Sequence, residues 1–312
     1  MFIKNEGFQD EITFVIFKGK SKNTFIESFQ IKNIIGGVIY MIDIIVNEKG
    51  AELTSIKFNG KEKLHDGLKD WNRHSPVLFP IVGKLKNGKT NINGREYEMG
   101  QHGFARDMNF QKISENKYIL ESNKETLEKY PFRFKLYIEY ETTDDEVKCK
   151  YKVVNEDNKK IYFGLGAHPA FICDYTSGEY ELKFEQNEEN LETYQLENGL
   201  VKEEKSDLTK NINSNGVKLD KDIFKDDAII LENLKSNKVA LIQNNEKVLE
   251  VDFKGFKYLG IWSKPNAKFL CIEPWMNTAD KVNSNGIYEE KEDIIRLSPN
   301  EEFNIEWKVK FY

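Results

Sequence analysis

Three titratable residues stand out because the backbone beside them is constrained. His102 occurs in MGQHGFARD (residues 99–107), His168 in GLGAHPAF (164–171) and Glu273 in FLCIEPW (269–275). A residue before proline is pushed into the extended region, so the His-Pro and Glu-Pro pairs restrict where these side chains point. The glycines on either side of His102 permit a tight turn. These constraints suit preset catalytic groups, and the alternative at each position is an ordinary turn or strand end.

Apolar neighbours surround two of these residues. His168 lies between FGLGA and Phe171, and Glu273 lies between FLCI and Trp275, so burial is expected to shift the pKa of both groups. Trp275 also offers a flat face for the C–H side of a sugar ring. Packing of this tryptophan inside the protein is the alternative interpretation.

Alternation of apolar and polar residues predicts the elements that must position these groups. RFKLYIEYE (133–141), EVKCKYKVV (146–154), EYELKFEQ (179–186) and EFNIEWKVKFY (302–312) all alternate with period two. Long alternation of this kind is typical of antiparallel sheet with one buried face. We therefore predict an all-β protein, a large antiparallel β-sandwich.

Turn signals support this interpretation, and helical signals are scarce. Asn-Gly occurs six times, at Asn59, Asn87, Asn93, Asn198, Asn215 and Asn285, which predicts recurrent hairpins. One short helix is expected in SNKETLEKYPF (122–132), beginning at Ser122 or Asn123 and ending before Pro131. The polar tract 186–225 is expected to form long loops or a protruding hairpin. Residues 1–37 are interpreted as an N-terminal extension and 38–312 as one domain.

Composition excludes several partners. The chain has 312 residues, 46 basic and 52 acidic, and a formal net charge of −6 without a basic block, so no nucleic-acid partner is expected. The longest apolar run, IIGGVIYMIDIIV (34–46), contains Asp43 and is shorter than a membrane span, so it predicts a strand. Three widely spaced cysteines and the absence of a signal-peptide pattern predict a reducing, cytoplasmic location.

The motifs together resemble a known family. FPIVGKLKNG (79–88), MGQHGFARD, GLGAHPAF and FLCIEPW are similar, in this order, to the aldose 1-epimerases, or galactose mutarotase-like proteins, and most of all to their LacX-like branch. The resemblance extends from about residue 41 to residue 312. It implies a galactose mutarotase-like β-supersandwich, which agrees with the sandwich predicted from alternation.

The resemblance also implies a reaction and roles for the titratable residues. An aldose 1-epimerase opens and recloses a sugar hemiacetal, so that the α and β anomers interconvert. By position, Glu273 matches the base that takes the proton of the C1 hydroxyl, and His168 matches the acid that protonates the ring oxygen. His102 matches a second histidine that bonds near that oxygen. We expect the acid and the base on opposite sides of one cleft, Glu273 as a carboxylate and His168 protonated.

The candidate substrate-binding residues are Lys84, Arg106, Asp227 and Trp275. Lys84 stands where the family usually has an arginine, and a lysine is a point donor rather than a planar fork. An ion pair with Asp107 is the alternative role for Arg106. Asp226 competes with Asp227 as the sugar-binding aspartate. Asp280, in PWMNTAD, is either a ligand contact or a turn cap.

Other classes of function remain open from the sequence. A non-catalytic carbohydrate-binding protein, or an epimerase acting on a sugar phosphate near Lys84, Lys86 and Arg106, could use the same residues. A zinc site built from His102, His168 and Glu273 is disfavoured, because the chain has no short-range ligand pair such as HxH or HExxH. We therefore expect a sugar as the small-molecule partner, no cofactor or metal and no membrane partner, and leave a homodimer open.

Overall fold

The computed structural model describes residues 41–188, 191–208 and 216–312, with the backbone of a few further short strands. Four of these strands lie before residue 41 and form two antiparallel pairs, β1 (Thr13–Ile16) with β4 (Phe29–Lys32) and β2 (Gly19–Ser21) with β3 (Thr24–Ile26). The rest of the N-terminal extension predicted for residues 1–37 lies outside the described residues.

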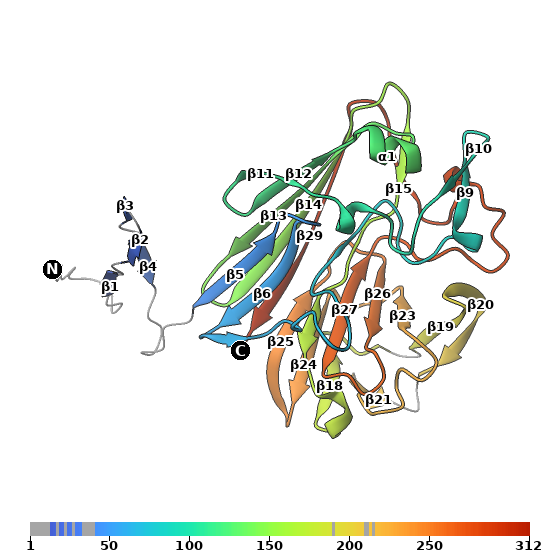
Figure 1. Ribbon diagram of the computed structural model, residues 1–312. Helices are drawn as coiled ribbons and strands as arrows, with labels where there is room; N and C mark the ends of the chain where they lie inside the picture. Colours follow the sequence, from blue (N-terminus) through green and yellow to red (C-terminus); the bar gives the residue numbers. More distant parts are fainter. Residues whose placement is uncertain are drawn as a thin grey trace.

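The larger of two main sheets contains all four strands predicted from long alternation (Figure 1). Buried and less buried side chains alternate along β13 and β14, as the sequence predicts for strands with one face in the core. In spatial order, its strands are β11 (Gln111–Ser114), β12 (Lys117–Glu121), β13 (Phe134–Thr142), β14 (Glu146–Asn155), β29 (Glu302–Phe311), β25 (Glu246–Asp252), β24 (Lys238–Gln243), β18 (Tyr180–Phe184), β22 (Gly216–Lys218) and β21 (Ile212–Asn213).

The second main sheet carries the chemistry-bearing motifs. Its spatial order is β23 (Ile229–Glu232), β26 (Tyr258–Trp262), β27 (Phe269–Trp275), β16 (Gly166–Ala167) and β8 (Val77–Leu78), and β17 (Ala170–Ile172) also pairs with β27. Every residue of β27 is buried. This central strand holds Glu273, and β16 and β17 flank His168.

The two main sheets pack face to face. One apolar core joins Leu136 and Val309 of the larger sheet with Leu259, Leu270 and Ile272 of the smaller one. Burial of this surface from water is the main stabilising contribution to such a sandwich. The predicted all-β sandwich is confirmed.

Smaller elements lie around the sandwich. They are β5 (Ile42–Asn47), β6 (Glu52–Phe58) and β7 (Lys61–Glu62), and the pairs β9 (Lys89–Ile92) with β10 (Arg95–Glu98), β15 (Ile161–Phe163) with β28 (Ile295–Leu297), and β19 (Glu192–Glu197) with β20 (Leu200–Asp207). The β19–β20 pair is the hairpin predicted as one alternative for the polar tract 186–225. The predicted helix is confirmed as α1 (Lys124–Lys129), with Asn123 as its N-cap.

The Asn-Gly pairs form hairpins at three of the six positions. Asn59, Asn93 and Asn198 each have positive φ and lie in two-residue turns between consecutive strands. Asn87 instead belongs to a short 3-10 turn that no strand directly precedes, and Asn285 lies in a loop. Asn215 lies outside the described residues. Among the described residues, no helix has the length and apolar character needed to cross a bilayer.

Candidate active site

Glu273 lies on the cleft-facing side of β27. Residues two apart on a strand share a face, so Cys271, Glu273 and Trp275 point away from the core that contains Leu270 and Ile272. Only 1% of the Glu273 side chain is exposed. The strand thus places a carboxyl group in a buried position.

Two glycines leave room for the indole of Trp275 beside this carboxyl group. An added Cβ at Gly260 would lie 2.5 Å from the Trp275 ring, and one at Gly166 would lie 2.8 Å from it. Gly260 pairs with Glu273 and Gly166 pairs with Trp275 in the sheet. The indole therefore lies over the neighbouring strands, which only side-chain-free residues permit.

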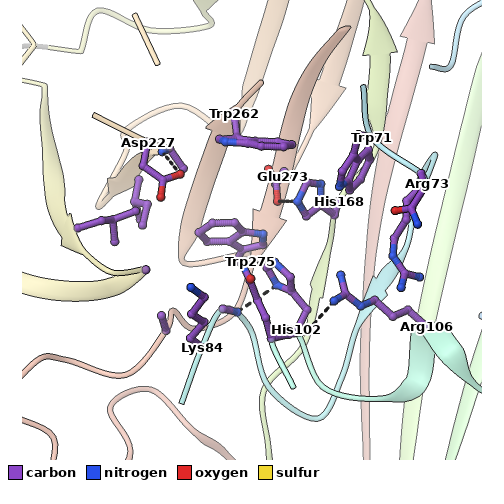
Figure 2. Close-up of a pocket in the computed structure, with 18 residues that line it drawn as sticks. Trp71, Arg73, Lys84, His102, Arg106, His168, Asp227, Trp262, Glu273 and Trp275 are labelled. Carbon is purple, nitrogen blue, oxygen red and sulfur yellow. Dashed lines mark hydrogen bonds and ion pairs between the residues drawn. The ribbon is translucent and has the colours of Figure 1, made fainter. Parts of the chain in front are cut away.

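His168 contacts Glu273 directly. Nε2 of His168 is 3.1 Å from Oε2 of Glu273, and the imidazole stacks on Trp71 with ring centroids 4.7 Å apart (Figure 2). We expected the two groups on opposite sides of a cleft, and this expectation is wrong. His168 follows β16, whose Gly166 pairs with Trp275 of β27, so the two side chains emerge from adjacent strands and lie side by side.

His102 faces the same cleft, held in one tautomer. The Gly83 N–H donates to Nδ1 of His102 at 3.1 Å, which favours the neutral tautomer with its proton on Nε2, the atom that lies 3.3 Å from the side-chain amide of Gln101. The His102 and His168 rings lie edge to face, 5.4 Å apart. His102 itself has φ 66°, and Gly103 has φ 72° with its backbone against Phe79. Of the two glycines in the motif, Gly103 is therefore the one that the turn requires.

Burial sets the protonation of the site. It lowers the pKa of His168 to about 3, helped by the charges of Arg106 and Arg73. It raises the pKa of Glu273 well above its ordinary value, and Asp227 adds to that rise. The pKa of His102 is lowered by the same cause. Both shifts favour a neutral imidazole and a protonated carboxyl group over the ionised pair that we expected.

The predicted substrate-binding residues line the same pocket, which has a volume of about 490 Å³. The structure brings Lys84, Arg106, Asp227 and Trp275 together with the three titratable residues. Such a volume suits a small ligand like a monosaccharide.

Lys84 and the three candidate aspartates lie in different environments. Nζ of Lys84 donates to the Asn198 carbonyl at 3.1 Å, so the β19–β20 hairpin closes this side of the pocket. Asp227 lines the pocket, whereas Asp226 lines a neighbouring cavity. Asp280 forms a buried ion pair with Lys291, its carboxylate oxygen 2.7 Å from the Lys291 Nζ.

Sequence reasoning missed several residues of the pocket, among them Trp71, Arg73 and Trp262. Trp71 and Arg73 belong to the loop between β7 and β8, where no periodicity indicates which side chains turn inward. Trp262 ends β26, and its indole meets the His168 ring edge to face at 6.0 Å. An aromatic residue at a strand end next to β27 was the available signal.

One group of side chains offers metal-ligand atoms. Ligand atoms of His168, Cys271 and Glu273 all lie within 4.8 Å of one another. Cys271 replaces His102 in the set weighed from the sequence. Burial raises the pKa of the Cys271 thiol well above its ordinary value, and a thiol must lose its proton before it binds zinc. This set could therefore bind a metal only after Glu273 and Cys271 had both lost their protons.

Comparison with known proteins assigns the family. A sequence profile described as aldose 1-epimerase matches residues 42–292. The chain belongs to the aldose 1-epimerase family. It is 33% identical over 270 residues to the chromosomal LacX protein of Lactococcus lactis subsp. lactis, covering 80% of this chain and 90% of LacX. The resemblance to the LacX-like branch is confirmed.

Solved structures agree with this family. A galactose mutarotase related enzyme from Lactobacillus acidophilus has 30% identity and a TM-score of 0.80, covering 87% of this chain and 95% of that one. A galactose mutarotase-like protein from Lactobacillus casei has 29% identity and a TM-score of 0.81, covering 88% and 99%. The fold is therefore galactose mutarotase-like.

Proposed function

We propose that the protein is an aldose 1-epimerase that interconverts the α and β anomers of an aldose. The observation that carries this proposal is the 3.1 Å contact between His168 and Glu273, with His102 beside it, in one pocket of sugar size. Ring opening needs one group to accept the O1 proton and another to give a proton to the ring oxygen. The adjacent pair supports both tasks.

The shared proton supports a simple cycle. In the reactive form Glu273 is a carboxylate and His168 carries the proton. Glu273 takes the O1 proton and His168 protonates the ring oxygen, the bond from C1 to that oxygen breaks, and the aldehyde carbon rotates. Closure on the other face reverses both transfers. Ring opening thus converts the pair to protonated Glu273 and neutral His168, which is the form that burial favours in the free site.

His102 and the tryptophans have supporting roles in this proposal. Nε2 of His102 carries the proton of the neutral ring, so it is a donor for oxygen atoms of the sugar. Trp71, Trp262 and Trp275 line the pocket and provide apolar faces for C–H groups. Lys84 and Asp227 provide a donor and an acceptor for hydroxyl groups.

A non-catalytic sugar-binding protein is the alternative. It would need the tryptophans and polar rim but not a buried acid–base pair, whose burial costs stability and is typical of functional sites. The direct test is anomer exchange measured by NMR on freshly dissolved aldoses, with and without the protein. Faster exchange supports the epimerase, and sugar binding without faster exchange would replace it with a binding protein.

A further inference from the structure

The indole ring of Trp275 lies across the central strand of the smaller sheet. An added Cβ at Gly166 would lie 2.8 Å from Cδ1 of the ring, and one at Gly260 would lie 2.9 Å from Cε2. Gly166 belongs to β16 and Gly260 belongs to β26, the strands on either side of β27. One end of the ring therefore lies over each neighbouring strand.

This orientation directs the N–H of the ring towards Glu273. Nε1 is bonded to both Cδ1 and Cε2, so it lies over β27 between the two glycines. Gly166 pairs with Trp275, whereas Gly260 pairs with Glu273, which is two residues earlier on the same face of β27. The line between the glycines thus runs from the register of Trp275 to that of Glu273. Figure 2 shows the nitrogen-bearing edge of the indole next to the Glu273 carboxyl group.

The indole N–H is a buried donor that needs an acceptor. Nε1 of Trp275 has no hydrogen-bond partner among the described residues. A buried tryptophan usually has a partner for its N–H, because an unpaired donor away from water is unfavourable. Trp307 on β29 shows the usual arrangement, since its Nε1 donates to the Tyr151 hydroxyl at 3.2 Å. For Trp275, the carboxyl group on its own face of β27 is the acceptor at hand.

We infer, on the basis of the proposed epimerase function, that Trp275 is a positioning residue, whose N–H donates to the Glu273 carboxylate in the reactive form of the pair. A carboxylate is a stronger acceptor than a neutral carboxyl group. The hydrogen bond therefore favours the form of Glu273 that takes the O1 proton, and it fixes the direction of the carboxylate oxygens. This role is separate from the apolar face that Trp275 offers to a sugar.

The electrostatics of the site support this role. Burial raises the pKa of Glu273, and the neighbouring Trp275 N–H opposes that rise. His168 contacts Oε2 of Glu273 at 3.1 Å, so the carboxylate of the reactive form has the imidazole as one neighbour and the indole as another. An indole N–H is a donor only. It therefore stabilises the carboxylate without competing with His168 as the acid.

The test removes the N–H and keeps the shape of the ring. In one variant benzothienylalanine replaces Trp275, so that sulfur takes the place of the N–H in a bicyclic ring of nearly the same size. Trp275→Phe is the simpler variant, which also shortens the apolar face. Trp307→Phe is the matched control, because it removes the hydrogen bond of a buried indole in the other sheet. Thermal unfolding shows whether each variant is folded.

We would measure kcat and KM for anomer exchange of galactose by NMR. The benzothienylalanine variant should lower kcat by about tenfold or more, the scale of a hydrogen bond to a charged group. Its KM should stay within about twofold, because the sugar keeps its contacts with the ring. Trp275→Phe should lower kcat to a similar extent and also raise KM. Trp307→Phe should lower the unfolding midpoint and leave kcat and KM unchanged.

A second measurement does not depend on activity. In proton–nitrogen correlation spectra, the indole signal that is lost in Trp275→Phe identifies this N–H. The signal should move upfield in Glu273→Leu, a variant that removes the acceptor and retains the approximate size of the side chain. If no sugar is interconverted, the proposed function fails, and the position of this signal still tests the hydrogen bond.

Two results would overturn the inference. One is a folded benzothienylalanine variant with the wild-type kcat, whether or not its KM rises, because Trp275 would then serve sugar binding alone. The other is an indole signal that stays in place in a folded Glu273→Leu variant, because the N–H would then have no bond to Glu273.

Discussion

His168 and Glu273 show how position in the sheet determines protonation. Their side chains come from adjacent strands, both are buried, and they are too close for each to keep its ordinary pKa. In the proposed cycle the stable and reactive forms of the pair carry the same number of protons, so transfer of one proton from Glu273 to His168 would interconvert them.

This leads to a prediction for pH dependence. Because the pKa of His168 is lowered to about 3, a second proton enters the pair only in strong acid. Because the pKa of Glu273 is raised, the single proton is lost only well above the ordinary glutamate value. We expect kcat/KM for galactose to stay level as the pH falls from about 6 to about 4, with no loss near the ordinary glutamate pKa, because the pair gains no second proton there. NMR exchange rates across this range provide the measurement.

A fall in the rate with an inflection near about pH 4.3, the ordinary glutamate pKa, would contradict that account, because it would require a carboxylate that titrates as an unburied glutamate does. The control is the urea midpoint at each pH, which separates titration of the site from loss of folded protein. Both measurements are to be made on the same samples.

At the scale of elements, β27 was predictable and the loops were not. The segment is apolar apart from Glu273, so the sequence predicts a buried carboxyl group there. The partner of a strand depends on contacts far apart in the chain, so the adjacency of His168 and Glu273 was missed. Loop residues such as Trp71 and Arg73 carry no periodic signal, and only the fold shows that they turn into the pocket.

A buried ion pair connects two of these loops. Asp280 accepts a hydrogen bond from the Lys86 N–H at 2.9 Å, and its other oxygen is 2.7 Å from Nζ of Lys291. The Asp280 N–H donates to the Lys84 carbonyl at 2.8 Å. Asp280 therefore holds the segment that carries Lys84 in place. Of the two roles left open from the sequence, a ligand contact and a turn cap, these contacts favour a structural role.

We predict that Asp280→Asn is strongly destabilising. The amide oxygen can still accept the hydrogen bond from the Lys86 N–H. The ammonium of Lys291, which is only 7% exposed, loses the carboxylate charge that compensates it. Breaking one side of a buried pair costs about 3 kcal/mol or more in the free energy of unfolding. Urea unfolding measures the change. Asp280→Asn combined with Lys291→Met should recover part of the loss, and a single-variant cost below about 1 kcal/mol would show that the pair is solvated.

At the scale of the whole molecule, one sandwich contains the entire candidate site. The alternating strands predicted from the sequence build the larger sheet, and the motif strands build the smaller one. Strands β1–β4 pair only with one another among the described strands, and the family match begins at residue 42. The site therefore depends on residues after the N-terminal extension.

We predict that a chain of residues 38–312 keeps the stability and activity of the full chain. Its thermal unfolding midpoint should agree within a few degrees, a shift corresponding to about 1 kcal/mol or less in a chain of this size. Its anomer exchange rate should agree within about twofold, because no group assigned to the chemistry is removed. An inactive or unfolded truncated chain would assign residues 1–37 a role in the domain.

The most direct test of the central claim is the rate of anomer exchange in a Glu273→Gln variant. Glutamine keeps the size of the side chain and its hydrogen-bonding capacity but cannot accept the O1 proton. If Glu273 is the base, NMR exchange rates should fall at least about a hundredfold, the scale for losing a positioned acid or base, while sugar binding changes little. A folded Glu273→Gln variant that interconverts anomers at the wild-type rate would contradict the proposed mechanism.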